Sequence, residues 1–213
     1  MPNSSHAATA GLAEQRKTQF PGRQAAKDAA ADTVGAVAGT GTSLFFYHRD
    51  DCHIQPVEIA PAIRSAIQRF PFKEQAQKSW IHVDIDGDCS VNAIPVLIDH
   101  LIFNLLKNCI YAIQAAGRGP CGEIRIRLAA DRHRQSLYLR DNGQGIPTAL
   151  LPRVFDPFFS TRANGTGLGL HFCRSVMNRF GGAIHCRSVP GEFTEIVLEF
   201  PRLESEAAQH RRS

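Results

Sequence analysis

The feature that most constrains the fold of this chain is a long helical pattern over residues 94–115. Within it, apolar, small and amide side chains recur at three- and four-residue spacing and fall on neighbouring positions of one helix surface: Leu97, Leu101, Leu105, Asn108, Ala112 and Ala115. Gly117 follows, and glycine commonly closes a helix because it adopts the left-handed backbone conformation without strain. The pattern therefore predicts one long helix that ends near Gly117.

Shorter patterns on both sides of this helix complete the expected fold. Apolar residues at helical spacing predict helices over residues 60–70 and 168–180, and Gly181 and Gly182 close the second. Alternating apolar and polar residues predict strands over residues 81–85, 123–128, 136–140, 184–187 and 195–200. Glycine- and proline-rich sequence predicts loops over residues 141–167. Helices combined with mostly hairpin-linked strands indicate an α+β fold, a two-layer sandwich with the helices on one face of a mixed sheet.

Composition divides the chain into three parts. Residues 1–43 are rich in Ala, Gly, Thr and Gln without sustained apolar periodicity, so we expect a low-complexity, disordered tail there. The organised pattern favours a single folded domain over residues 44–203. The charged residues 204–213 are expected to form a second disordered tail.

The bulk properties argue against several functional classes. The formal charge of +4 is small for 213 residues and the basic residues are scattered, so no nucleic-acid partner is expected. The longest apolar runs, such as residues 101–106, are too short to cross a bilayer, and no membrane insertion is expected. None of the six cysteines forms a Cys-x-x-Cys pair, which argues against zinc and redox motifs. With no export signal over residues 1–43, the reducing cytoplasm is the expected compartment.

Polar residues form a stripe on the long predicted helix. His100, Asn104 and Asn108 are one turn apart, and Lys107 lies beside them. Two asparagines placed in this way offer neutral oxygens to a hard cation and amide donors to phosphate oxygens, which suits magnesium–nucleotide binding. An amphipathic helix with incidental asparagines explains the same residues equally simply.

Two glycine-rich segments follow. Asp141-Asn-Gly143-Gln-Gly145-Ile146 comes directly after a predicted strand, where a carboxylate can accept a hydrogen bond from an exocyclic amine such as that of adenine. Ordinary turn chemistry is the alternative. The second segment opens a predicted helix, where exposed N–H groups favour phosphate, although a flexible loop is the alternative: Gly165, Thr166, Gly167, Leu168 and Gly169. It matches neither the P-loop nor the dinucleotide fingerprint.

Taken together, these motifs resemble the catalytic and ATP-binding domain of sensor histidine kinases over about residues 52–201. The asparagine helix resembles the N box of that family, Asp141-x-Gly143-x-Gly145 its G1 box and residues 165–170 its G2 box, while Phe155-Asp-Pro-Phe158-Phe159 resembles its F box. The family shares its fold, the Bergerat type, with type II topoisomerases, a heat-shock chaperone class and mismatch-repair ATPases. Asn-Leu-Leu-Lys-Asn and Pro-Phe-Phe-Ser-Thr-Arg look most like bacterial hybrid kinases of the quorum-sensing sort.

The resemblance implies ATP and Mg²⁺ as cofactors and a role for each motif residue. It makes Asn108 the magnesium ligand, with Asn104 on phosphate or its water shell. Asp141 would hold the adenine amine, with Gly143, Gly145 and Ile146 shaping that wall. The aromatic residues Phe155, Phe158 and Phe159 would anchor a short mobile ATP lid, residues 160–164. The phosphate groups would be wrapped by Gly165, Thr166, Gly167, Leu168 and Gly169, with Lys107 and Arg162 as the nearest cations.

Two positions depart from the family pattern. His100 stands where many relatives carry an acidic residue, so it is a candidate proton acceptor and equally a structural histidine. Tyr111 stands where many relatives carry a lysine, which would leave phosphate neutralisation to Lys107.

The phospho-accepting half of a histidine kinase is not recognisable in the sequence. None of His6, His48 and His53 has the setting of a phospho-acceptor, and residues 1–43 lack a heptad pattern. We therefore expect a protein-histidine kinase domain whose γ-phosphoryl acceptor lies on a separate dimerisation domain, with a response regulator downstream. The alternatives are an ATP-dependent interaction module or a degenerate kinase fragment without phosphotransfer. A serine kinase of the anti-sigma-factor type shares the fold, but the Phe-rich motif fits it less well.

Overall fold

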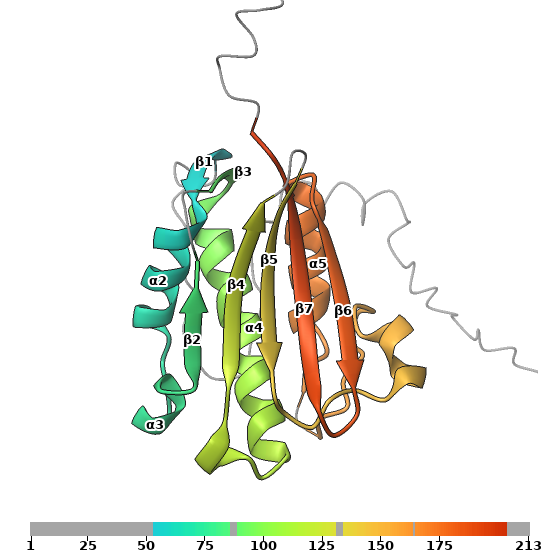
Figure 1. Ribbon diagram of the computed structural model, residues 1–213. Coiled ribbons are helices and arrows are strands. Elements are labelled where there is room, and N and C mark those ends of the chain that lie inside the picture. The colour runs from blue at the N-terminus through green and yellow to red at the C-terminus, as the bar shows by residue number, and fades with distance from the viewer. Residues whose placement is uncertain (1–52, 86–88, 131–133, 164, 204–213) are drawn as a thin grey trace, which may run out of the picture. The chain divides into compact units, whose positions relative to one another are not determined.

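The computed structural model describes residues 53–85, 89–130, 134–163 and 165–203, and these residues contain an α+β domain (Figure 1). The predicted tails, residues 1–43 and 204–213, lie outside the described residues. So do the predicted first residues of the domain, 44–52.

A five-stranded mixed sheet forms one layer of the domain. Its strands lie in the order β2-β4-β5-β7-β6, with β2 and β4 parallel and the other neighbours antiparallel. The strands are β2 (Ile81–Asp84), β4 (Ile124–Ala130), β5 (Arg134–Asp141), β6 (Ala183–Val189) and β7 (Phe193–Pro201). The five predicted strands are thereby confirmed, with ends that differ by a few residues.

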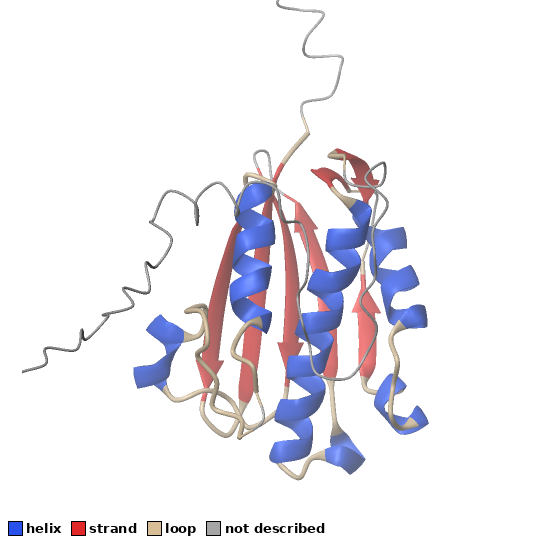
Figure 2. Ribbon diagram, turned by 180° about the vertical axis from the view of Figure 1, so that it is seen from behind, coloured by secondary structure: helices blue, strands red, loops and turns tan. Residues whose placement is uncertain are grey.

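Three helices form the second layer and cover one face of the sheet (Figure 2). They are α2 (Ile59–Arg69), α4 (Pro95–Ala115) and α5 (Gly169–Arg179), with α4 between the other two. They confirm the three helices that the apolar spacing predicts. Gly117 has φ +67°, as expected for a residue that closes a helix.

The core lies between α4 and the sheet. The side chains of Leu101, Leu105 and Ile113 on α4 pack there with Ile124 of β4 and Leu198 of β7, and all five are at most 1% exposed. By length and hydropathy α4 would qualify as a membrane span, and it is the one such helix in the part of the chain that is described. Its apolar side chains are used by the core, which accounts for that composition.

Several short elements are additional to the predicted ones. β1 (Gln55–Glu58) pairs antiparallel with β3 (Ser90–Ala93) in a separate two-stranded sheet, and α3 (Gln75–Lys78) is a single turn. Two 3₁₀ helices, Gly119–Cys121 and Thr148–Arg153, lie in connections, the second within the segment predicted as loop.

Candidate functional site

The carboxylate at the end of β5 is buried. Asp141 is 4% exposed, and Gly143 donates its backbone N–H to Oδ1 of Asp141 at 2.9 Å. Burial raises the pKa of Asp141 to about 6, and hydrogen bonds from Gly143, Cys109 and Thr194 oppose that rise. Such a carboxylate is a hydrogen-bond acceptor in a desolvated place, where an added donor group is worth more than in water.

The loop that follows Asp141 is held from two sides. Gln144 donates its backbone N–H to the carbonyl of Ala112 on α4 at 3.0 Å, and its own carbonyl accepts from Gly191 in the β6–β7 turn at 2.7 Å. Ile146 donates its backbone N–H to Oγ of Ser188 at 2.8 Å. The loop therefore bridges the last turns of α4 and the end of β6.

Two glycines of this loop allow backbone approaches that a side chain would block. A Cβ on Gly143 would lie 2.5 Å from the carbonyl carbon of Ala112. Gly145 has φ +68°, and a Cβ there would lie 2.2 Å from the carbonyl oxygen of Val189. The glycines that the sequence singles out are thus required by close packing, in addition to any role toward a ligand.

Arg118 also holds the loop after Asp141, and no sequence motif indicated this role. Its Nη1 donates to the carbonyl of Asn142 at 2.6 Å, and its Nη2 donates to the carbonyl of Gly191 at 2.6 Å. The side chain of Asn142 in turn holds the backbone of Glu123 and Cys121. The one feature of the sequence that could have indicated this role is the position of Arg118 directly after Gly117, because a basic side chain near a helix end can bind backbone carbonyls.

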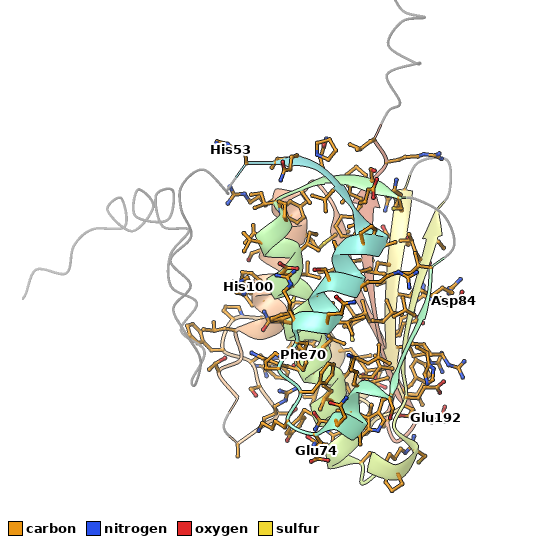
Figure 3. All side chains as sticks on the ribbon, turned by 90° about the vertical axis from the view of Figure 1, so that its left-hand side faces the viewer. His53, Phe70, Glu74, Asp84, His100 and Glu192 are labelled. Atoms are coloured by element: carbon orange, nitrogen blue, oxygen red, sulfur yellow. The ribbon has the colours of Figure 1, made fainter. Side chains whose placement is uncertain are left out.

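The polar stripe on α4 is present and partly buried. Nδ2 of Asn104 donates to the carbonyl of His100 at 2.9 Å, while Oδ1 faces α5, where a Cβ on Gly169 would lie 3.2 Å from it. Burial, and then the charge of Lys107, lower the pKa of His100. Lys107 itself is exposed. Figure 3 shows His100 on α4 above the level of Glu192, which belongs to the turn near the lower end of the domain.

The second asparagine of the stripe binds a cationic side chain. Nη2 of Arg162 donates to Oδ1 of Asn108 at 2.7 Å, and the guanidinium carbon of Arg162 lies 4.0 Å from the centroid of the Tyr111 ring. Burial lowers the pKa of Arg162. The oxygen of Asn108 therefore stands in a place that accommodates positive charge.

The Phe-rich motif leads from the loop region to α5. Phe155 is partly buried and packs against the core, and Phe159 lies under the guanidinium of Arg153 at 4.8 Å. Phe158 is 78% exposed and has φ +64°. A Cβ on Gly167 would lie 2.3 Å from the carbonyl carbon of Phe158, so the two segments touch through their backbones.

The N-terminus of α5 has no side-chain cap. The helix begins at Gly169, and its N-cap residue Leu168 makes no capping hydrogen bond. Leu168 donates its backbone N–H to Oγ1 of Thr166 at 3.4 Å, and Gly165 and Thr166 are exposed. Uncapped N–H groups and the positive end of the helix dipole favour an anion there.

The residues predicted from four separate motifs are therefore neighbours at one end of the domain. Asp141 and its loop contact the last turns of α4, Arg162 contacts Asn108 and Tyr111, and the start of α5 approaches Asn104. In the described residues, no group of three or more His, Cys, Asp or Glu side chains is arranged to hold a metal. On the polar stripe of α4, the side-chain oxygens that can bind a cation are the amide oxygens of Asn104 and Asn108.

A family model agrees with this arrangement. The model described as histidine kinase-, DNA gyrase B- and HSP90-like ATPase matches residues 93–204, just over half of the chain. The chain belongs to this family, and within it to the ATP-binding catalytic domains of sensor histidine kinases. The resemblance drawn from the four motifs is thereby confirmed.

Individual proteins show the same similarity. The CAI-1 autoinducer sensor kinase/phosphatase CqsS of Vibrio cholerae is 32% identical over 182 residues, which cover 83% of this chain and 26% of CqsS. The autoinducer 1 sensor kinase/phosphatase LuxN of Vibrio campbellii is 34% identical over 149 residues, covering 70% of this chain and 17% of LuxN. The catalytic domain of histidine kinase ThkA superposes with a TM-score of 0.58 at 27% identity, covering 70% of this chain and 96% of that one. The chain thus spans about a quarter or less of these two curated relatives and nearly the whole of the isolated catalytic domain.

Proposed function

We propose that this chain binds Mg²⁺·ATP at the end of β5 and transfers the γ-phosphoryl group to a histidine on a separate helical dimerisation domain. A response regulator would receive the group next, and the chain would act in the cytoplasm without inserting into the membrane. The observation that carries the proposal is the convergence of a buried carboxylate, two amide oxygens and an uncapped helix N-terminus: Asp141, Asn104, Asn108 and Gly169.

In this proposal the loop after β5 recognises the adenine. The buried Asp141 carboxylate accepts the exocyclic amine, because the hydrogen bonds from Gly143, Cys109 and Thr194 leave part of its acceptor capacity unused. Gly143 and Gly145 keep the backbone of the loop tight against α4 and β6. Ile146, which is partly exposed, offers an apolar side chain beside the base.

The amide oxygens of α4 fit a hard divalent cation. Oδ1 of Asn108 already accepts a cationic donor, and Oδ1 of Asn104 faces the start of α5. Because Nδ2 of Asn104 is bound to the helix backbone, Asn104 presents an acceptor and suits the water shell of the metal better than a phosphate oxygen. The metal would supply charge neutralisation for the phosphate oxygens.

The phosphate groups would lie against the start of α5. The glycines around Thr166 allow the chain to approach closely, and the uncapped N–H groups of α5 supply donors. Phe155 and Phe159 anchor the segment that precedes the phosphate loop. Positive charge is supplied by Lys107 and by Arg162, whose Nη2 donates to Oδ1 of Asn108 at 2.7 Å.

His100 is proposed as the proton acceptor for transfer. Its lowered pKa keeps the imidazole neutral near pH 7, the state in which a ring nitrogen can take a proton. Its place one turn before Asn104 puts it on the same face of α4 as the proposed metal ligand.

Calorimetric titration of the full chain with a non-hydrolysable ATP analogue, with and without Mg²⁺, tests the nucleotide site. Magnesium-dependent binding is expected, and Asn108→Ala should weaken it about tenfold or more. Asn178→Ala, which removes an exposed amide from the other end of α5, is the matched control and should bind normally. Absence of binding by the unmodified chain would contradict the proposal.

Phosphotransfer needs a second experiment with a supplied acceptor. Incubation of the chain with γ-labelled ATP and a helical hairpin that bears a phospho-acceptor histidine should give acid-labile label on the hairpin. The label should be lost with Asn108→Ala and kept with Asn178→Ala. Tight analogue binding combined with failure to label any acceptor hairpin would favour the ATP-dependent interaction module instead.

A further inference from the structure

Arg162 is held by two groups of α4 that lie one turn apart. Its Nη2 donates to Oδ1 of Asn108 at 2.7 Å, and its guanidinium carbon lies 4.0 Å from the centroid of the Tyr111 ring. Residues three apart on a helix share a face, so one guanidinium can reach both groups at once. The contact fastens the segment after the Phe-rich motif to the helix that carries the proposed metal ligand.

The charge of Arg162 is poorly balanced by this pair of contacts. The groups that hold it are an amide oxygen and an aromatic ring, and both are neutral. The side chain is partly buried and desolvated, yet a guanidinium stays protonated in proteins. A desolvated cation between neutral partners stabilises an anion placed beside it, and it repels a second cation.

The repulsion of a second cation by Arg162 bears directly on Oδ1 of Asn108. This oxygen accepts a hydrogen bond from Arg162, and it is also the oxygen proposed to bind Mg²⁺. A guanidinium donor and a metal cannot lie along the same side of one amide oxygen, because their charges repel over such short distances. Although the oxygen has two lone pairs, Arg162 and the metal therefore compete for it through the repulsion of their charges.

We propose that Tyr111 is a positioning residue that holds Arg162 on Asn108, so that Arg162 competes with Mg²⁺ for that oxygen and is released toward the phosphate oxygens when the metal binds. The inference rests on the proposed Mg²⁺·ATP site and adds a regulatory contact to it. The aromatic face is the part of Tyr111 that matters, since its contact with the guanidinium is a cation–π interaction.

Limited proteolysis with trypsin, in the absence of nucleotide, tests directly whether Arg162 is held by Asn108 and Tyr111. Trypsin must bind the Arg162 side chain to cut after it, so the contact with α4 should protect this bond. In the full chain, Tyr111→Leu should speed cleavage after Arg162 about fivefold, the effect expected from losing a cation–π contact. Tyr111→Phe keeps the ring and should cleave like the unmodified chain. Equal cleavage rates for Tyr111→Leu and the unmodified chain would overturn the proposed contact.

The dependence of analogue binding on the Mg²⁺ concentration tests whether Arg162 competes with the metal for Oδ1 of Asn108. The Mg²⁺ concentration that gives half-maximal binding should fall severalfold in Tyr111→Leu and stay unchanged in Tyr111→Phe. Arg162→Gln should lower it as well, while weakening the analogue at saturating Mg²⁺ because a phosphate-facing cation is lost. An unchanged magnesium requirement in Tyr111→Leu would overturn the competition. If no variant binds the analogue, the proposed function and the competition both fail, and proteolysis still decides whether Tyr111 holds Arg162.

Discussion

Asp141 and Gly143 are joined by a hydrogen bond that closes the loop back on the end of β5. The backbone N–H of Gly143 donates to Oδ1 of Asp141 at 2.9 Å, and both residues are buried. The arrangement fixes the position of the carboxylate, and burial raises its pKa to about 6 although Gly143, Cys109 and Thr194 donate hydrogen bonds to it. The affinity of any ligand that donates a hydrogen bond to this carboxylate should therefore change with pH near 6.

Analogue binding should weaken as the pH falls below 6. Only the ionised carboxylate accepts with both oxygens, so protonation of Asp141 removes an acceptor that the adenine amine needs. Titrations between pH 5 and pH 8 should show an affinity loss of about tenfold per pH unit well below 6. Asp141→Asn is the control, because any pH dependence that remains in it comes from other groups, such as the nucleotide phosphates and His100. Identical pH profiles for the two proteins would contradict this role.

The same pKa gives a stability prediction of defined sign. The folded state raises the pKa of Asp141 above the value of 3.8 for an unperturbed aspartate, so the folded state binds the proton more tightly than the unfolded state. Stability from this group is fully present below about pH 4 and is lost as the pH rises through about 6. Asp141→Asn should therefore raise the free energy of unfolding at pH 7.5 by about 3 kcal/mol, with a smaller difference at pH 4.5. Equal stability differences at both pH values would contradict the raised pKa.

Gly145 should be far less tolerant of alanine than Gly117. Both have a left-handed backbone, φ +68° and φ +67°, so both pay a similar conformational cost of about 1 kcal/mol when a Cβ is added. A Cβ on Gly145 would in addition lie 2.2 Å from the carbonyl oxygen of Val189, whereas Gly117 has open space around it. Gly145→Ala should lower the free energy of unfolding by about 3 kcal/mol or more and weaken analogue binding. Gly117→Ala should cost only the backbone component and leave analogue binding unchanged.

The sheet and the long helices were predictable because their patterns are local. Each of α2, α4 and α5 repeats apolar residues at helical spacing, and the strands of the five-stranded sheet alternate or run apolar between turns. β1 and β3 were not predictable in this way. Each has four residues, and their pairing joins Val57 to Val91 across α2 and β2, a contact that no short window of sequence contains. The turn α3 buries Gln77, which has no apolar period to reveal it.

The outline of the site was predictable because the family motifs identify the segments of the chain that form it. The motifs located Asp141, the asparagines of α4 and the start of α5, which lie together. They did not reveal Arg118, whose partners are backbone carbonyls and therefore leave no trace in residue type. They also gave no partner for Arg162, because its contact with Asn108 joins residues 54 apart in the chain.

The Arg118 clamp should matter for both stability and binding. The guanidinium joins the carbonyl of Asn142, next to Asp141, to that of Gly191 in the facing turn. Arg118→Met keeps much of the side-chain volume and removes these donors, so it should cost about 1–2 kcal/mol of stability and weaken analogue binding severalfold. Arg69→Met, which removes an exposed ion pair with Asp99 on α4, is the control and should cost less than 1 kcal/mol with normal binding. If Arg118→Met binds the analogue as the unmodified chain does, the loop needs no clamp.

The left-handed backbone of Phe158 predicts a stabilising substitution. A phenylalanine at φ +64° is strained, and with its side chain 78% exposed little packing offsets that strain. Phe158→Gly should relieve the strain and raise the stability by about 0.5–1 kcal/mol, or roughly 2 °C in the thermal midpoint. Phe158→Ala removes the same exposed ring but keeps the Cβ, so it isolates the backbone contribution and should leave the midpoint nearly unchanged. Equal midpoints for the glycine and alanine variants would show that the backbone at residue 158 carries no strain.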